Sequence, residues 1–449
     1  MLWPEHTHRN DDGELVIGGI STVSLAEEFG TPLYVFDEPT LRQRAQIAVA
    51  AAYAGGPGSR AVFASKALEL PVILGILAEE GLGIDVVSGG ELFVALQSGI
   101  DPSVITFHGN NKSPQELQEA INAEIELIAV DNLYELDLLS ELSAGREHPV
   151  PILLRVNPGI DVHTHDKIAT GVLDSKFGFP LWNGDAATAV TRTLEIPGIT
   201  LKGFHCHLGS QLFDEQVAIL AIEKVVAFAA EMRRDHGIEC AIISPGGGMG
   251  ISYLEGMPEM DIAEWMGATA DALERNSAMA NMPQPALVFE PGRWIVGPAG
   301  VALYRVGSRR DIDGVRSYVS VDGGMADNIR PTLYDATYTA ELANRVGDGT
   351  ETVTVAGKYC ESGDVLIRDI DLPRLEPGDL LAVPAAGAYC IPMASNYNLA
   401  LKPAVVIVSE GRATLIRRRE TYADLLTLDV RPNDELFDAR NSFARSSNW

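Results

Sequence analysis

The chain is short of basic residues. Among its 449 residues, 34 Lys and Arg stand against 62 Asp and Glu, which leaves a formal net charge of −28 at pH 7. A negative field of that size repels nucleic-acid phosphates and anionic lipids. The composition therefore predicts neither a nucleic-acid partner nor attachment to a membrane surface.

Cysteine and long apolar runs are scarce as well. The four cysteines, at 206, 240, 360 and 390, form no CxxC pair, and this spacing suits a reducing compartment. No run of 18 apolar residues occurs, and the first six residues (MLWPEH) are not a basic segment leading into an apolar one. We therefore expect a cytoplasmic protein without a signal peptide or a membrane span.

What the chain does contain is the pattern of repeated β-α units. From about residue 60, short β-rich apolar runs alternate with segments of helical apolar spacing, the clearest helix being expected over 214–235. Eight strands are expected, at 61–65, 84–88, 104–108, 126–130, 151–156, 200–208, 240–245 and 286–290. Eight such units predict an α/β protein with a (β/α)8 TIM barrel, whose chemistry belongs at the C-terminal ends of the strands.

A second pattern begins after residue 295. Apolar runs such as ETVTVAGKYC and DLLAVPAAG are separated there by Gly, Asp and Pro turns, which is typical of antiparallel β structure. Two β-like runs among the first 35 residues (ELVIGG and PLYVF) are expected to join it. The predicted division is a barrel over 36–295 and a mostly antiparallel β domain from 1–35 and 296–449.

Polar residues and glycines gather where four of the barrel strands are expected to end. They form the segments ASKA (64–67), HCHLGS (205–210), PGGG (245–248) and EPGR (290–293). Taken alone, Lys66 is typical of a solvated strand end, and the glycine triplet is typical of a tight turn. Glycine N–H groups also admit an anion closely, and a phosphate site after the last strands recurs in barrels, where Arg293 would add a charge.

A metal site is the other chemistry that these segments suggest. His205 and His207, two apart on an expected strand, face the same side. No third or fourth ligand follows at a familiar spacing, and His163 and His165 are equally isolated. The sequence therefore predicts no metal.

A phosphate-bearing cofactor that bonds to lysine would unite the segments. Pyridoxal phosphate needs a lysine amine, a phosphate cradle, a partner for its ring nitrogen and a group against its ring face. In that order the candidates are Lys66, the glycine triplet with Ser210 and Arg293, Glu290, and His207. A carboxylate keeps the ring nitrogen protonated and the electron sink strong, which suits decarboxylation.

The ordered motifs of the chain resemble those of the fold-type III pyridoxal-phosphate decarboxylases, and among these most closely the enzymes that act on diaminopimelate. The resemblance runs from Pro32 to about Tyr397. The motifs are FASKA (63–67), DVVSGGEL (85–92), HGNNKS (108–113), RVNPGID (155–161), HCHLGSQ (205–211), GGGMGI (246–251), EPGR (290–293), VDGGMADN (321–328), CESGD (360–364), GAYC (387–390) and MASNYN (393–398). The residues before the glycine triplet, Ile243-Ser244-Pro245, depart from the family pattern.

The resemblance implies roles at the cofactor. Lys66 would hold the cofactor aldehyde, Asp85 and Glu290 would support its polar edge, and His207 would stack on its ring. The remaining implied cofactor contacts are Ser210, Gly246, Gly247, Gly248, Gly292, Arg293 and Tyr389.

The resemblance also implies a substrate site. Arg293, Arg330 and Tyr334 would surround the distal carboxylate, and Glu361 would bind the distal ammonium. Tyr389 would close the site and also bind the substrate. Cys360 would return a proton, arriving from the neighbouring subunit of a head-to-tail homodimer. From spacing alone, Cys360 is expected in the core, as are Cys206 and Cys240.

The implied activity is the decarboxylation of meso-2,6-diaminopimelate to L-lysine and carbon dioxide, the last step of lysine biosynthesis. An enzyme for ornithine or lysine would leave a buried arginine without its carboxylate, at a cost of several kcal/mol. Two alternatives stay open: a related decarboxylase for ornithine, arginine or a secondary-metabolism substrate, and a pyridoxal-phosphate-binding protein without catalysis.

Overall fold

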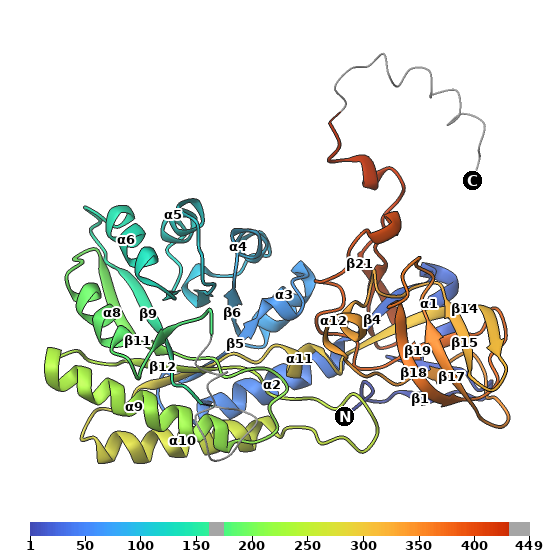
Figure 1. The fold of residues 1–449 in the computed structure, drawn as a ribbon, viewed down its shortest axis with the longest axis horizontal. Helices are drawn as coiled ribbons and strands as arrows, with labels where there is room; N and C mark the ends of the chain where they lie inside the picture. Colours follow the sequence, from blue (N-terminus) through green and yellow to red (C-terminus); the bar gives the residue numbers. More distant parts are fainter. Residues whose placement is uncertain (161–174, 431–449) are drawn as a thin grey trace.

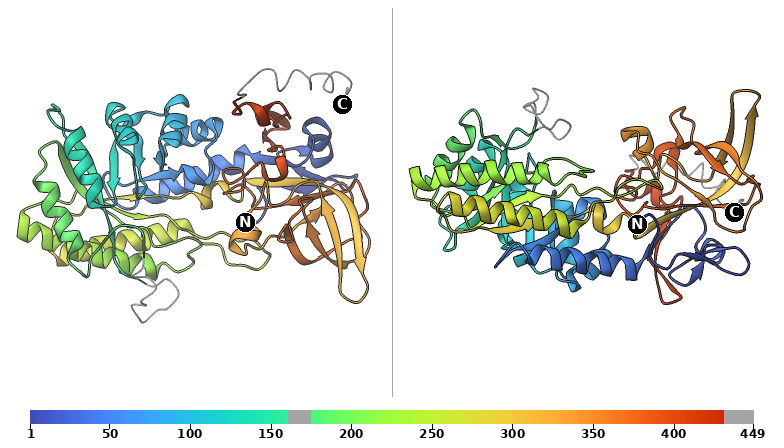
Figure 2. Two further views of the ribbon diagram at one scale, coloured as in Figure 1. Left: turned by 45° about the horizontal axis from the view of Figure 1, so that its top comes forward. Right: turned by 90° about the horizontal axis from the view of Figure 1, so that it is seen from below.

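The computed structural model describes residues 1–160 and 175–430, in which a barrel and a β-rich domain lie side by side along the longest axis (Figures 1 and 2). The expected residues His163 and His165, and the end of the RVNPGID motif, lie outside the described residues. Among the described residues, no helix has both the length and the apolar character needed to cross a membrane.

All eight expected barrel strands are present. They are β5 (Arg60–Ala64), β6 (Gly83–Val86), β7 (Ile105–Phe107), β8 (Leu127–Val130), β9 (Val150–Asn157), β11 (Ile199–His205), β12 (Ile242–Gly246) and β13 (Ala286–Phe289). They pair in parallel, and the pairings β13–β5 and β8–β9 close the ring. A short strand, β10 (Phe179–Pro180), pairs in parallel with the last two residues of β9. The predicted (β/α)8 barrel is confirmed.

Helices cover the outside of the barrel (Figure 1). They are α2 (Glu38–Tyr53), α3 (Pro71–Glu79), α4 (Gly89–Gln97), α5 (Pro114–Asn122), α6 (Leu133–Leu142), α8 (Asp185–Leu194), α9 (Gln216–His236) and α10 (Ile262–Met279). Local sequence fixes several ends: Ser113 and Glu116 form a capping box on α5, and Gly237 ends α9 in a left-handed conformation. The helix expected over 214–235 is confirmed as α9.

The second domain is built on a mixed sheet of mostly antiparallel pairs. Its long path runs β18 (Val365–Leu372), β17 (Glu351–Ala356), β15 (Arg316–Val321), β14 (Gly300–Ile312), β4 (Leu33–Asp37), β20 (Ala404–Ser409), β21 (Arg412–Arg417), with β19 (Leu380–Val383) and β16 (Glu341–Leu342) beside β14. Among the described strand pairs of this sheet, only β15–β17 and β4–β20 are parallel. A small sheet of β1 (His8–Arg9), β2 (Leu15–Ile17) and β3 (Ile20–Ser21) precedes α1 (Thr22–Phe29).

Strand β4 shows why this sheet unites distant parts of the chain. All five of its residues are buried. Because successive side chains point to opposite faces of a strand, Tyr34 and Phe36 join the main core, whereas Leu33 and Val35 join a second core with α1 and β2. The same alternation in β14 and β20 makes the central strands of this sheet apolar on both faces.

The structure corrects three expectations. The sixth strand, β11, ends at His205 and not at 208, so His207 lies beyond the strand and does not share a strand face with His205. The strand β14, central to the second sheet, had not been expected from the sequence. Cys360 lies four residues after β17 and is exposed, whereas Cys206 and Cys240 are buried as expected.

Candidate active site

A cavity of about 520 Å³ lies where the C-terminal ends of the barrel strands meet the second domain. It is lined by many of the residues expected at the site: Lys66, His207, Ser210, Gly248, Glu290, Gly292, Arg293, Arg330, Tyr334 and Tyr389. Asp85 is buried at the end of β6, and Gly246 and Gly247 begin the loop that leads to Gly248. Cys360 and Glu361 do not line the cavity.

Lys66 lies in a short 3-10 turn, Ser65–Ala67, directly after β5. Burial alone lowers the pKa of this amine, but the nearby Asp85, Tyr389 and Glu290 outweigh burial and hold the pKa raised. The Tyr389 N–H donates to the carbonyl oxygen of Ala67 at 2.9 Å. The second domain therefore holds the lysine turn in place through a backbone hydrogen bond.

The acidic end of the cavity is the Glu290 carboxylate, with Asp85 buried near it and not lining the cavity itself. Glu290 Oε1 accepts a hydrogen bond from the Ser244 hydroxyl at 2.7 Å and lies 3.2 Å from His205 Nε2. Although burial raises the pKa of Glu290, the neighbouring His205 and His108 lower it well below its usual range. Burial and the charge of Glu290 raise the pKa of Asp85 well above the usual range of an aspartate.

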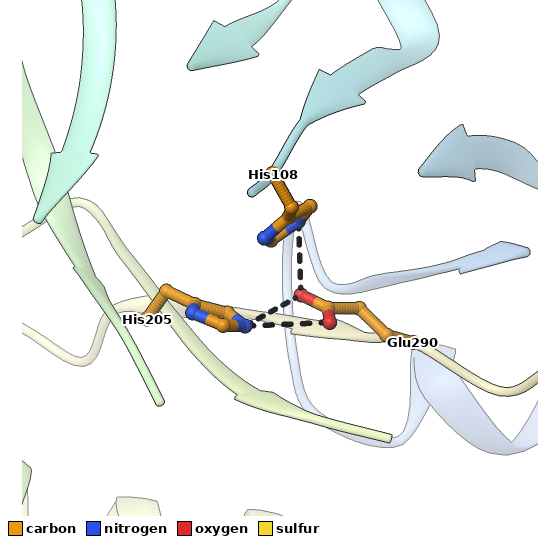
Figure 3. Close-up of side chains that lie close together, drawn as sticks. All are labelled: His108, His205 and Glu290. Atoms are coloured by element: carbon orange, nitrogen blue, oxygen red, sulfur yellow. Dashed lines mark hydrogen bonds and ion pairs between the residues drawn. The ribbon is translucent and has the colours of Figure 1, made fainter. Parts of the chain in front are cut away.

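The two histidines of the HCH segment have different surroundings. His205 is buried against Glu290 and His108, with the His108 and His205 ring centroids 4.6 Å apart (Figure 3). His207 lines the cavity, and burial together with nearby Lys66 lowers its pKa to about 3. No role for His108 could be predicted from the sequence, although this residue opens the HGNNKS motif immediately after β7.

The glycine triplet is required by the packing around it. A Cβ on Gly247 would lie 2.0 Å from the carbonyl oxygen of Glu290, and one on Gly248 would lie 2.4 Å from that of Gly209. Gly248 also has a φ of +106°, which residues with a side chain rarely adopt. The triplet thus lets the chain pass close to neighbouring backbone at the end of β12, and Gly248 brings bare backbone to the cavity.

Arg293 begins the short helix α11 (Arg293–Val296), and its guanidinium faces the same part of the cavity. It donates to the Ser210 hydroxyl at 2.9 Å and to the Tyr253 hydroxyl at 2.6 Å, and lies 4.7 Å from the centre of the Tyr389 ring. No carboxylate pairs with it in the described part of the chain. Tyr253 was missed from the sequence, since only the fold brings it to Arg293.

Arg330 begins the short helix α12 (Arg330–Tyr334), which comes from the second domain. It is 5% exposed, donates to the Tyr338 hydroxyl, and lies 4.9 Å from the ring centre of Tyr253. Among the described residues no carboxylate forms an ion pair with it. Tyr334, at the other end of α12, lines the cavity but is 62% exposed.

The CESGD segment stands apart from these residues. Cys360 and Glu361 are exposed, the Cys360 N–H donates to Asn398 Oδ1 at 3.0 Å, and the Glu361 carboxylate contacts its own segment at Ser362 and Gly363. The structure therefore separates two expected site residues from the others within one chain.

The residues present fit pyridoxal phosphate. Both Asp85 oxygens and Arg293 Nε are buried without a hydrogen-bond partner among the described residues, so polar atoms at or beside the cavity are left for a ligand to satisfy. An amine, a carboxylate pair, and an arginine beside bare glycine backbone match the aldehyde, the ring nitrogen and the phosphate of this cofactor.

Comparison with known proteins agrees with this geometry. The model of the pyridoxal binding domain of pyridoxal-dependent decarboxylases matches residues 43–297. The diaminopimelate decarboxylase of Bacillus subtilis (strain 168) is 46% identical over 94% of this chain and 97% of the relative. The one from Synechocystis sp. is 47% identical over 94% of this chain and 92% of the relative.

Solved structures give the same result. The crystal structure of diaminopimelate decarboxylase from M. jannaschii in complex with L-lysine is similar with a TM-score of 0.89 at 36% identity, over 96% of this chain and 99% of that one. The likeness covers the barrel and the β domain together. The chain therefore belongs to the pyridoxal-dependent decarboxylases and, within them, to the diaminopimelate decarboxylase family.

Proposed function

We propose that the protein removes the carboxylate from the D-configured centre of meso-2,6-diaminopimelate, giving L-lysine and carbon dioxide in the last step of lysine biosynthesis. The observation that carries the substrate is Arg330. Arg330 is a buried cation without a carboxylate partner among the described residues, and it lines the same cavity as Lys66. Because an unpaired buried charge is costly, an anionic group of the ligand would stabilise it. The distal carboxylate of diaminopimelate is such an anion, and ornithine, arginine and lysine have none at that end.

The cofactor is pyridoxal phosphate, which when bound supplies a sink for the electron pair left behind by departing carbon dioxide. We propose that Lys66 holds its aldehyde, that Asp85 and Glu290 serve the polar edge and that His207 lies against the ring. The residues that would bind the phosphate are Ser210, Gly246, Gly247, Gly248, Gly292 and Arg293, with Tyr389 at the edge of the site.

Arg330 and Tyr334 would bind the distal end of the substrate, together with Arg293 and Tyr389. Arg330 is held by the Tyr338 hydroxyl and by the face of Tyr253, so its remaining N–H groups stay available for a carboxylate. An arginine that is already positioned loses little side-chain entropy when it binds. These contacts orient the reacting centre toward Lys66.

We further propose that a second subunit completes the site. Cys360 and Glu361 lie outside the cavity of their own chain and are exposed, and so are Leu333 and Tyr334 on α12. In a head-to-tail homodimer, Cys360 of the neighbouring chain would return a proton to the carbon that lost carbon dioxide, and Glu361 would bind the distal ammonium.

We also propose that the chain divides into a barrel domain over 36–295 and a β domain over 1–35 and 296–449. A cytoplasmic location is proposed as well, because four unpaired cysteines suit a reducing compartment.

A panel of amino acids tests the substrate. Purified protein with pyridoxal phosphate should release carbon dioxide from meso-diaminopimelate and form L-lysine. D-lysine is the sharpest control, because it keeps a D-configured reacting centre and lacks the distal carboxylate. Turnover of L-ornithine or L-arginine in place of diaminopimelate would contradict the proposal, and cofactor binding without turnover of any member would favour a non-catalytic protein.

A further inference from the structure

Three buried side chains meet at the acidic end of the cavity: His108, His205 and Glu290 (Figure 3). His205 Nε2 lies 3.2 Å from Glu290 Oε1 and 3.3 Å from Oε2, and His108 Nε2 lies 3.4 Å from Oε1. The three side chains come from the ends of β7, β11 and β13. The proposed function assigns no role to His108 or His205. Both face the Glu290 carboxylate, which is proposed to contact the ring nitrogen of pyridoxal phosphate.

The distances assign the proton on His205. A neutral imidazole has one N–H donor and one lone pair, and a nitrogen near both oxygens of an ionised carboxylate must be the donor. His205 Nδ1 is buried without a hydrogen-bond partner among the described residues, which leaves the lone pair there. His205 therefore donates its Nε2–H to Glu290.

Other charged and polar groups also face the cluster and act on the Glu290 carboxylate in opposite directions. Asp85 contributes a second carboxyl group, whose Oδ1 lies 3.7 Å from His108 Nε2, the same atom that faces Glu290. Lys66 and Arg155 act on the cluster as cations, and Ser244 adds a hydroxyl donor to Glu290. A buried carboxylate that loses its donors takes up a proton.

We propose that His205, supported by His108, is a positioning residue that keeps the Glu290 carboxylate charged and aimed at the ring nitrogen of bound pyridoxal phosphate. The proposal rests on the proposed placement of the cofactor. An uncharged Glu290 would no longer hold a proton on the ring nitrogen, and the sink for electrons would weaken. His205 would thus act on the reaction through Glu290 without touching the substrate.

A metal ion is the competing explanation, because the ligand atoms of the three residues lie within 4.8 Å of one another. A metal would need the lone pair of His205 Nε2, the atom that the carboxylate requires as a donor. The Ser244 hydroxyl also occupies Oε1 already. These contacts favour a hydrogen-bonded cluster.

Two amide variants test the proposal without removing polarity. The amide nitrogen of Gln reaches the position of His Nε2, whereas that of Asn reaches only the position of Nδ1. His205→Gln should therefore keep the donor to Glu290, and His205→Asn should lose it. His236→Leu, at the exposed end of α9, is the control for the loss of a histidine.

The primary readout is the 15N NMR shift of the ring nitrogen in protein loaded with 15N-labelled pyridoxal phosphate. The shift should report a protonated nitrogen in the unmodified chain, H205Q and H236L, and a neutral one in H205N. H205N should also lose about 10- to 100-fold in kcat with little change in KM. Because the NMR measurement needs no substrate, it stands even if the substrate assignment fails.

An unchanged ring-nitrogen signal in folded, cofactor-loaded H205N would overturn the proposal. So would stoichiometric zinc in the purified holoenzyme that is lost in both amide variants. If H205N does not fold, Ser244→Ala removes the other donor to Glu290 and should shift the ring-nitrogen signal in the same direction, and no shift there would also overturn it.

Discussion

The two ends of the cavity are built in different ways. At the cofactor end, Asp85, His108, His205 and Glu290 are all buried and come from the ends of barrel strands. At the substrate end, Arg330 is buried, but Tyr334 is exposed and Glu361 lies outside the cavity. This difference supports the proposal that one chain completes the cofactor site and that a second chain completes the substrate site.

The physical reason lies in the supporting elements. Neighbouring barrel strands fix one another through backbone pairing, so side chains at their ends hold a defined geometry. The residues proposed for the substrate lie on a short helix and on loops of the second domain, which have fewer such constraints. A second subunit would supply the missing contacts at that end.

Replacing the cofactor lysine should have the largest effect. Lys66→Ala removes the amine that bonds to the cofactor, and kcat/KM should fall by at least about 10⁴-fold. The visible absorbance of lysine-bound pyridoxal phosphate should disappear, while Lys202→Ala, whose side chain lies outside the cavity, should retain it. Persistence of that absorbance in K66A would show that another lysine holds the cofactor.

Replacing Cys360 tests whether the substrate end is shared. Cys360→Ala should lower kcat by about 10²- to 10⁴-fold, the range for losing a positioned proton donor, and leave the absorbance of bound cofactor unchanged. Mixing K66A with C360A under conditions of subunit exchange should restore activity, because one site of a mixed dimer has both residues. Sedimentation should report a dimer, and an active monomer would contradict the comparison drawn above.

Replacing the unpaired arginine tests substrate selection. Arg330→Met should cost about 2–5 kcal/mol of transition-state binding, roughly 30- to 4,000-fold in kcat/KM for meso-diaminopimelate. The rate with D-lysine should change far less, since it has no distal carboxylate to lose. Steady-state kinetics on both substrates would measure this, and an equal loss on both would place Arg330 outside substrate recognition.

The smallest effect concerns the loop that leads to Arg330. Asp327 there accepts hydrogen bonds from the Tyr304 hydroxyl at 2.6 Å and the Gly324 N–H at 2.9 Å, and burial raises its pKa to about 6 from 3.8. A pKa raised by folding favours the folded state below the unfolded pKa, and this benefit is lost as pH rises through the folded value. The wild-type chain should therefore lose up to about 3 kcal/mol from this group between pH 4 and pH 7.

Asp327→Asn cannot titrate, so this part of the pH dependence should vanish in the variant. Thermal unfolding of both proteins at pH 4, 5, 6 and 7 measures it, and the stability of the wild type relative to the variant should decline as pH rises. Parallel pH profiles for the two proteins would show that Asp327 does not titrate in this range.

Several site residues could be predicted from the sequence because they directly follow strands. Lys66 after β5, the glycine triplet at the end of β12 and Glu290 after β13 all lie at the cavity or its edge, where barrel topology places strand ends. Arg330 and Tyr334 were reached only through resemblance, since no strand pattern points to α12. Their place in the cavity depends on how the second domain packs on the barrel.

Other residues gave no usable signal in the sequence. Tyr253 and Tyr338 read as ordinary aromatic residues, and only the fold places both around Arg330. His205 was grouped with its neighbour His207 by spacing, but β11 ends between them, and His205 faces His108 from β7 instead. Spacing along one segment does not reveal contacts between segments nearly 100 residues apart.

The alternation of strands and helices, and hence the barrel, follows from the amino-acid sequence, because local apolar periodicity and turn residues act over a few positions. The chemistry available at the strand ends follows from it as well. Which groups meet depends on the folded chain: the Glu290 cluster, the arginine held between tyrosines, and the separation of Cys360 from Lys66. Those contacts arise from strand closure and domain packing, which depend on the whole chain at once.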